Sequence, residues 1–335
     1  MKLFIKKIFL YFLVGTLPFI VLIIGYIILD PFRVVWKYDN YSNLHIIPNR
    51  DYVTTEMYLK NRKNEDYNSF IFGSSRTLAF NPDSWKKYIG HEARPFIFDA
   101  SGETIFGIYK KIVFLDNLNS KLENVLIVVC PDLTFQTTVN SPGHLFIKHP
   151  STSGESWITF HLTFLKSYFN TYFLRAYYEY TFTKNIRPFM FDYIEFRNIY
   201  FHPITNSMTI EDKELEINLN PEKYYDEREG VFWKRPEKQQ EYDEFIGVTQ
   251  EKMLKEIYRI LNSKNSEYKI IISPLYEQKE INEKDLYKLE EIFGKDKIFN
   301  FSGINDITLK SINYYESSHY RPSVGDSIIN YIYQN

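Results

Sequence analysis

Residues 8–29 contain no charged side chain, and this stretch constrains the chain more than any other feature. At a rise of about 1.5 Å per residue, a helix of this length spans a bilayer core of ~30 Å. Lysines at positions 2, 6 and 7 precede the stretch, which favours a cytoplasmic N-terminus. A cleaved signal peptide is the alternative, but the stretch is longer than a usual signal core and no Ala-x-Ala-like site follows it. The sequence therefore predicts an uncleaved, single-pass anchor over 1–30 in the cell membrane, with an extracytoplasmic C-terminal part.

The overall composition excludes several classes of function. A net charge of −2 gives no electrostatic footprint for nucleic acid. Cys130 is the one cysteine and lies in an apolar run, so no internal disulfide forms, and zinc-ligand spacing is absent. The sequence therefore calls for no metal ion and no cofactor.

Short apolar runs alternate with helical patterns in two parts of the chain, which is typical of strands joined by right-handed crossovers. The expected strands are 70–72, 95–98, 124–130, 268–273 and 297–301. The expected helices are 81–88, 104–118, 241–261, 284–293 and 323–333. This order predicts a three-layer α/β fold with about five parallel strands.

The chain after the anchor is expected to divide into a connector and one domain with an insertion. Residues 31–66 are polar and mixed, and we expect a connector with one helix near 54–61. The remainder, 67–335, is expected to form one extracytoplasmic domain. Residues 136–240 lack a strand–helix rhythm and are expected to form a large insertion, as a cap or side lobe.

The predicted insertion has two distinct parts. Residues 157–183 are dense in Phe and Tyr and are expected to be helical. Such side chains stack on sugar rings, rest against a membrane or simply pack a core. Residues 211–229 are charged and expected to be exposed. The histidines of the insertion match no metal motif.

The first strand ends in residues suited to nucleophilic chemistry. Gly73 permits a sharp turn at the carboxyl end of the strand, and Ser74, Ser75 and Arg76 follow at once. In an open parallel sheet this edge binds ligands, and a serine before a helical turn sits over N–H groups able to stabilise an anion. The alternative is a turn whose serines cap the next helix.

A second group lies between the last strand and the last helix. His319 is on an expected loop, 317–322, that can reach the carboxyl edge of the first strand, and Glu316 stands three residues earlier. A serine nucleophile needs a base, and the histidine needs a carboxylate to fix its tautomer. An ordinary surface histidine is the alternative. We expect Ser75, His319 and Glu316 to converge at the sheet edge.

Together the two groups resemble the SGNH, or GDSL-type, hydrolase superfamily, which implies a flavodoxin-like fold. In that family a Gly-x-Ser block after the first strand carries the nucleophile, and Ser75 matches it. A glycine after the second strand supplies an oxyanion N–H, and Gly102 matches it. The last block is Asp-x-x-His, matched by His319 with Glu316 in place of the aspartate. The resemblance implies a Ser75–His319–Glu316 triad, with the oxyanion held by the Ser75 and Gly102 N–H groups.

The chain departs from the family at the third strand. The family carries an oxyanion-donating asparagine there, whereas this chain has Asp132, which cannot donate when ionised. Losing one such donor costs ~10²–10³ in rate. Alternatively, Asp132 pairs with Arg76 to hold the turn.

Two arginines and a serine flank the proposed catalytic residues. Arg76 and Arg321 are expected to pair with a nearby carboxylate, the candidates being Asp99, Asp132 and Glu316, or to bind an anionic substrate. Ser74 is expected to face the turn or the helix cap rather than the site.

The Gly-Ser-Ser-Arg start, the His-Tyr-Arg-Pro ending and the anchor resemble membrane-anchored SGNH-like proteins of bacterial envelope acylation, such as those of alginate acetylation and teichoic-acid D-alanylation. The resemblance implies an envelope glycan substrate and a membrane-bound O-acyltransferase partner. We therefore expect a membrane-anchored, extracytoplasmic serine O-acyltransferase or esterase. The alternative is a catalytically degenerate SGNH-fold subunit that binds carbohydrate or acts as a scaffold.

Overall fold

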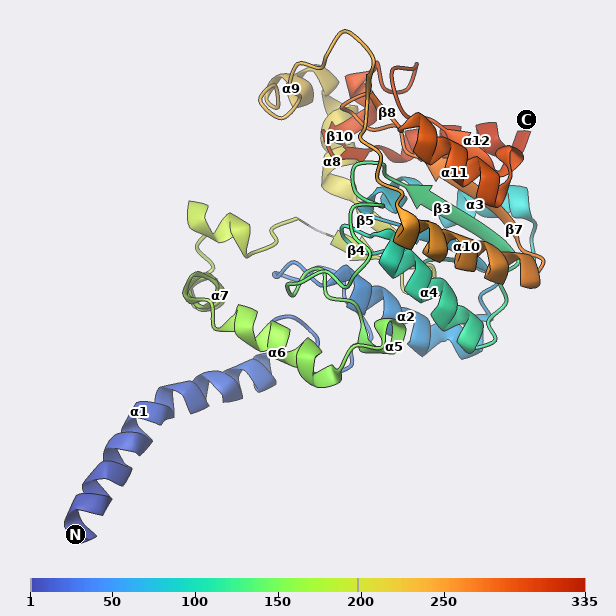
Figure 1. Cartoon of the computed structure of the whole chain (residues 1–335). Helices are drawn as coiled ribbons and strands as arrows, with labels where there is room; N and C mark the ends of the chain where they lie inside the picture. The colour runs from blue at the N-terminus through green and yellow to red at the C-terminus, as the bar shows by residue number, and fades with distance from the viewer. Residues whose placement is uncertain (1, 198, 335) are drawn as a thin grey trace.

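The computed structural model describes residues 2–197 and 199–334. Its centre is a five-stranded sheet in the order β2-β1-β3-β7-β9, in which every neighbouring pair is parallel (Figure 1). The strands are β1 (Ser69–Gly73), β2 (Pro95–Ile97), β3 (Asn124–Val129), β7 (Glu267–Ile272) and β9 (Ile298–Asn300). The strand order reverses at β1, so the carboxyl ends of β1 and β3 border the crevice where open α/β sheets bind ligands.

Helices cover both faces of this sheet and make three layers, as the sequence predicts. Alternate side chains of β1 point to opposite faces, so Phe70 and Phe72 enter one apolar cluster and Ile71 enters the other. The first face carries α2 (Arg50–Glu65), α4 (Ile105–Asn117), α10 (Val248–Ser263) and α11 (Glu283–Phe293). The second face carries α3 (Pro82–Ile89) and α12 (Pro322–Gln334).

Two predicted boundaries are wrong. The helix expected from 241 begins at Val248, because β6 (Gln240–Glu241) pairs with β8 (Lys279–Glu280). The loop expected at 317–322 is instead part of a hairpin formed by β10 (Tyr314–Glu316) and β11 (His319–Tyr320). The hairpin forms because Tyr314 and Tyr320 pair across it and are buried in the second cluster.

Residues 31–66 contain the expected helix, but it is longer than predicted and packs into the main core as α2. The first nine residues of this helix are buried, and its Tyr58 ring stacks on Phe98 at 5.4 Å between centroids. Its polar residues have buried partners, since Arg50 lies 3.0 Å from Asp99 and also donates to the Asn206 side chain. Composition alone misleads here, because the partners of these polar groups come from distant segments.

The insertion forms two groups of elements. The α-helices and strands of the insertion that precede β6 are α5 (Pro150–Ser153), α6 (Trp157–Tyr168), α7 (Thr171–Thr183), β4 (Ile199–Phe201), β5 (Met208–Ile210), α8 (Glu211–Leu219) and α9 (Pro221–Asp226). The predicted helical stretch 157–183 is two helices, because Asn170 caps a new helix by accepting from two backbone N–H groups of α7. In Figure 1, α6 and α7 lie near the N-terminal helix, whereas β4, β5 and α8 lie near the sheet edge.

The N-terminal helix α1 (Lys2–Leu29) projects from the rest of the molecule (Figure 1). Within the described residues it is the one helix long and apolar enough to cross a membrane, over the 26 residues Phe4–Leu29. Most of its large apolar side chains are exposed, as expected of a helix whose partner is lipid.

Candidate active site

The turn after β1 fixes the direction of the two serines. Gly73 has a φ of +154°, and a Cβ there would lie 2.8 Å from a carbonyl oxygen of β3, so only glycine fits this close turn. Ser75 then opens a short 3₁₀ turn, η1 (Ser75–Ala79). The Ser74 hydroxyl caps that turn and lies 3.4 Å from the buried Cys130 sulfur. Ser74 therefore faces the turn, as predicted, and leaves the outward position to Ser75.

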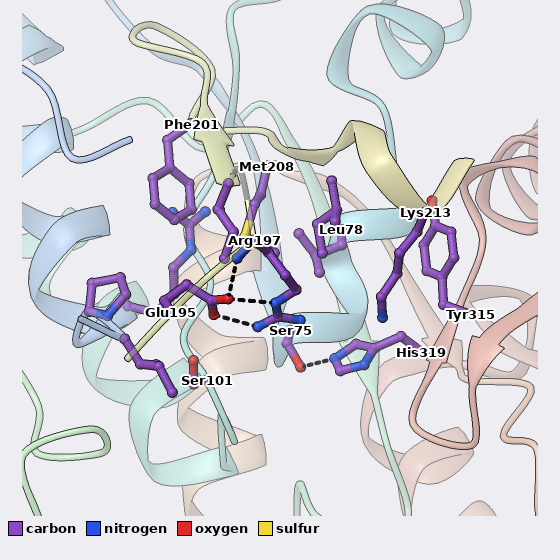
Figure 2. Close-up of a pocket in the computed structure, with 15 residues that line it drawn as sticks. Ser75, Leu78, Ser101, Glu195, Arg197, Phe201, Met208, Lys213, Tyr315 and His319 are labelled. Atoms are coloured by element: carbon purple, nitrogen blue, oxygen red, sulfur yellow. Dashed lines mark hydrogen bonds and ion pairs between the residues drawn. The ribbon is translucent and has the colours of Figure 1, made fainter. Parts of the chain in front are cut away.

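Ser75, His319 and Glu316 meet at the carboxyl edge of the sheet. Ser75 Oγ lies 2.8 Å from His319 Nε2, and Figure 2 shows the hydroxyl pointing at the ring. His319 Nδ1 is hydrogen-bonded to Glu316 Oε1, because the hairpin register places the two residues opposite each other. With Nδ1–H donating to the carboxylate, Nε2 is left to accept the serine proton.

The Glu316 carboxylate is held in its charged form. Burial alone raises the pKa of Glu316, but the hydrogen bond and charge of His319, together with those of Lys213, lower it to about 2. Lys213 Nζ lies 2.7 Å from Oε2, so each carboxylate oxygen has one partner. A charged carboxylate at this position orients the imidazole and stabilises its protonated form.

The backbone N–H groups of Ser75 and Gly102 are relevant to anion binding, and their loops lie close together. Within residues 2–197 and 199–334, the N–H groups of Ser75 and Gly102 have no hydrogen-bond partner. The loop that carries Gly102 is held against the turn, because Ala100 donates to the Gly73 carbonyl oxygen at 3.2 Å. These are the two groups that the family resemblance implies for an oxyanion hole.

The Asp132 carboxylate is engaged by Arg76. Arg76 makes two parallel 3.0 Å bonds to Asp132, and its Nε donates to the Ser318 carbonyl oxygen at 2.9 Å. Arg76 therefore links the loop after β3 to the turn that carries the histidine. Arg321 pairs with none of the three carboxylates expected for it, because Glu214 of α8 lies 2.6 Å from its Nη2.

A pocket of about 740 Å³, including its open mouth, lies beside Ser75 and His319 (Figure 2). Its walls from the insertion are mostly apolar, and they include Ile199, Phe201, Met208 and Ile210. Its polar lining includes Lys213 and the ion pair between Arg197 and Glu195, 2.6 Å apart. An apolar cavity with a few convergent polar groups is typical of a ligand site.

The contribution of α8 to this site was missed in the sequence. The prediction that 211–229 is an exposed charged stretch is wrong in part, because Lys213 binds Glu316 and Glu214 binds both Arg321 and the Tyr315 hydroxyl. Lys213 and Glu316 are 103 residues apart, and a run of charges reads as a solvated helix. No local signal in the sequence identifies this contact.

No protein-family model matches the chain, and no curated protein matches it.

Proposed function

We propose that this protein is a membrane-anchored, extracytoplasmic serine O-acyltransferase or esterase that acts on a cell-envelope glycan. The observation that carries the proposal is the 2.8 Å contact between Ser75 Oγ and His319 Nε2, with Glu316 on the other ring nitrogen. A hydroxyl, an imidazole and a carboxylate in this order form the arrangement that activates serine at neutral pH. The apolar helix α1 supports the membrane location.

The proposed reaction has two halves. Ser75 Oγ attacks the carbonyl carbon of an acyl donor while His319 Nε2 takes the hydroxyl proton. The oxyanion is held by the Ser75 and Gly102 N–H groups, and the donor's alcohol leaves with the proton from His319. In the second half, a sugar hydroxyl gives its proton to His319 and attacks the acyl-serine, which regenerates Ser75. Water in place of the sugar makes the same protein an esterase.

The wider assignment rests on the residue pattern. The Gly73-Ser74-Ser75 block, the Gly102 loop and the Glu316-x-x-His319 block support membership of the SGNH-type superfamily. The same pattern, with an N-terminal anchor, supports a place beside a membrane-bound O-acyltransferase in envelope glycan acylation.

A carbohydrate-binding or scaffold subunit is the second candidate, and one observation favours it. Arg76 occupies both oxygens of Asp132, so the third oxyanion donor of the family has no substitute at that position. A site with only two donors stabilises the oxyanion less, by ~10²–10³ in rate for one lost donor.

One transfer experiment separates the candidates. The full-length protein in nanodiscs is given p-nitrophenyl acetate and an oligosaccharide prepared from an envelope glycan, and the oligosaccharide is then analysed by mass spectrometry. We expect acetylated oligosaccharide with the wild type and with Ser74→Ala, and none with Ser75→Ala. Release of nitrophenol without acetylated sugar would show that the protein is an esterase and not a transferase to this glycan. Oligosaccharide binding with no release above that of Ser75→Ala would favour the scaffold.

A further inference from the structure

Helices α6 and α7, with the segment just after α7, expose a set of large apolar side chains on the part of the insertion that packs on α1. We call this set the apolar face, and it comprises Trp157, Ile158, Leu162, Tyr172, Phe182 and Ile186. Leu162 is 57% exposed and Phe182 is 79% exposed. Between 157 and 187 the chain carries four basic residues and one acidic residue. Basic side chains around an apolar surface are typical of helices that lie in a membrane interface.

The turn between α6 and α7 packs on the C-terminal half of α1. The Tyr168 hydroxyl donates to the Leu22 carbonyl oxygen at 3.0 Å, and its ring lies 5.1 Å from the Tyr26 ring. The Phe169 ring lies 6.4 Å from the Phe19 ring. These contacts place the α6–α7 turn alongside residues 19–26 of the candidate membrane span.

Gly25 of α1 lies against the Tyr178 hydroxyl of α7. A Cβ at this position would lie 2.7 Å from the Tyr178 hydroxyl oxygen, so a larger residue would displace the end of this side chain. That hydroxyl is in turn 2.6 Å from the hydroxyl of Tyr168. Both hydroxyls therefore find partners within the helix cluster and do not need water.

The position of these contacts along α1 sets the depth of the turn. Phe19 precedes the last residue of α1, Leu29, by ten positions, which is ~15 Å of helix. A 26-residue span is longer than a hydrocarbon core of ~30 Å, so its last residues lie among the headgroups. The α6–α7 turn then lies on the order of 10 Å below the outer surface of the hydrocarbon, which is the depth reached by interfacial helices.

The polar groups of α6 and α7 suit such an environment. The hydroxyls of Thr163, Ser167 and Thr181 each donate to a carbonyl oxygen one turn earlier, at 2.9, 3.1 and 2.6 Å. Hydroxyls bonded along their own helix are tolerated in lipid. The acidic Glu179 is paired with Arg175 and Arg187, at 3.5 and 2.5 Å.

We propose that the apolar face is embedded in the outer leaflet of the membrane that α1 crosses, with lipid acyl chains as its occupant. The inference rests on the membrane anchoring in the proposed function. An apolar groove of about 750 Å³, including its open side, lies between α1 and α6 and takes part of one acyl chain; Ile23, Ile27, Leu162 and Leu165 help line it. The insertion thus holds the pocket at a fixed height above the bilayer.

Spin labels on the full-length protein in phosphatidylethanolamine–phosphatidylglycerol liposomes test the proposal. Nitroxides are attached at Leu162→Cys and Phe182→Cys, with Val14→Cys on α1 as the reporter of the anchor. Val248→Cys is the matched control, since this valine is 71% exposed but lies on α10. The parent chain measures any labelling of the buried Cys130. Collision of each label with oxygen, which concentrates in lipid, is compared with collision with a water-soluble nickel chelate.

We expect the labels at 162, 182 and 14 to collide mainly with oxygen, and the label at 248 to collide mainly with nickel, with a several-fold difference in the ratio. Nickel access at 162 and 182 with a lipid-buried label at 14 would overturn the proposal that the apolar face is embedded, while supporting the membrane anchor. Nickel access at all three positions would overturn both. Spin–spin broadening at 162 would show a second copy on the face and would also overturn the proposal.

Discussion

The serine and the histidine of the candidate site are held in place in different ways. The turn that carries Ser75 is fixed by the sheet, by the close approach at Gly73 and by Thr77, which donates to the Ser74 carbonyl oxygen at 2.9 Å. The buried carboxylate of Asp99 accepts from Thr77 beneath this turn. Every one of these contacts lies within the α/β core.

The hairpin that carries His319 is held partly by the core, through buried Tyr314 and Tyr320, and partly by the insertion. Its contacts with α8 are the ion pairs of Lys213 with Glu316 and of Glu214 with Arg321, and the side chains of these pairs are 13–30% exposed. Breaking an ion pair near water costs less than breaking a buried one, because the partner left behind is solvated. The α/β core alone therefore places Ser75, whereas the placement of His319 and Glu316 also depends on α8.

The largest expected effect is on the chemical step. Ser75→Ala and His319→Ala should each lower the turnover of p-nitrophenyl acetate by ~10³-fold or more, because nucleophile and base act as one unit and their losses do not add. Ser74→Ala should retain most activity, because its hydroxyl faces the turn. A double variant much slower than either single variant would show that the two residues act separately.

Glu316→Gln should lower kcat by ~10²–10⁴-fold, because the amide neither fixes the tautomer nor stabilises the imidazolium. Because the pKa of Glu316 is about 2, its titration should not produce an acid limb in the pH–rate profile above pH ~4. An acid limb that disappears in Glu316→Gln but persists in Lys213→Met would contradict this assignment.

The lowered pKa of Glu316 also links stability to pH. Its folded pKa of about 2 lies below the ordinary 4.5, so its contribution is fully present above pH 4.5 and is lost as the pH falls through about 2. Between these values, thermal unfolding of Glu316→Gln should depend less on pH than that of the wild type.

A matched pair of variants tests the two kinds of anchoring. Asp99→Asn leaves the buried Arg50 without its counter-charge and should lower the free energy of unfolding by about 3 kcal/mol. Glu214→Gln should cost about 1 kcal/mol or less, because its pair is partly exposed, and yet it should lower kcat by loosening the hairpin. Thermal unfolding of the full-length protein in detergent measures the two losses of stability. Equal losses would contradict the claim that the two regions are held by contacts of different strength.

Local features of this chain could be predicted from its sequence, whereas contacts between distant segments could not. The strands, the turn at Gly73 and the two catalytic blocks are local patterns, so they were predicted and the structure places Ser75 and His319 in contact. The burial of α2 and the role of α8 were not predicted, because the charged partners of Arg50 and Lys213 lie far along the chain. Charge alone made both helices look solvated, since only the tertiary fold supplies the opposite charges.

Asp132→Asn should lower the free energy of unfolding by about 1–3 kcal/mol, because it breaks the bidentate pair with Arg76. It should not raise esterase activity, since Asp132 faces Arg76. Thermal unfolding and p-nitrophenyl acetate turnover measure the two effects. A faster variant of unchanged stability would instead place this residue in the oxyanion hole.

The smallest expected effect is that of Lys213→Met. Glu316 keeps its bond to His319, so we expect kcat to fall several-fold with little change in KM, and Lys213→Arg to recover part of the loss. A change in KM alone would assign Lys213 to substrate binding, because this lysine also lines the pocket.

The most direct test of the central claim is the site of the covalent intermediate. The full-length protein is mixed with p-nitrophenyl acetate, quenched in acid within the first turnover and digested, and the acetylated peptide is located by mass spectrometry. We predict one acetyl group on Ser75, absent in Ser75→Ala and strongly reduced in His319→Ala. Acetylation that persists in Ser75→Ala, or turnover of that variant at the wild-type rate, would contradict the account.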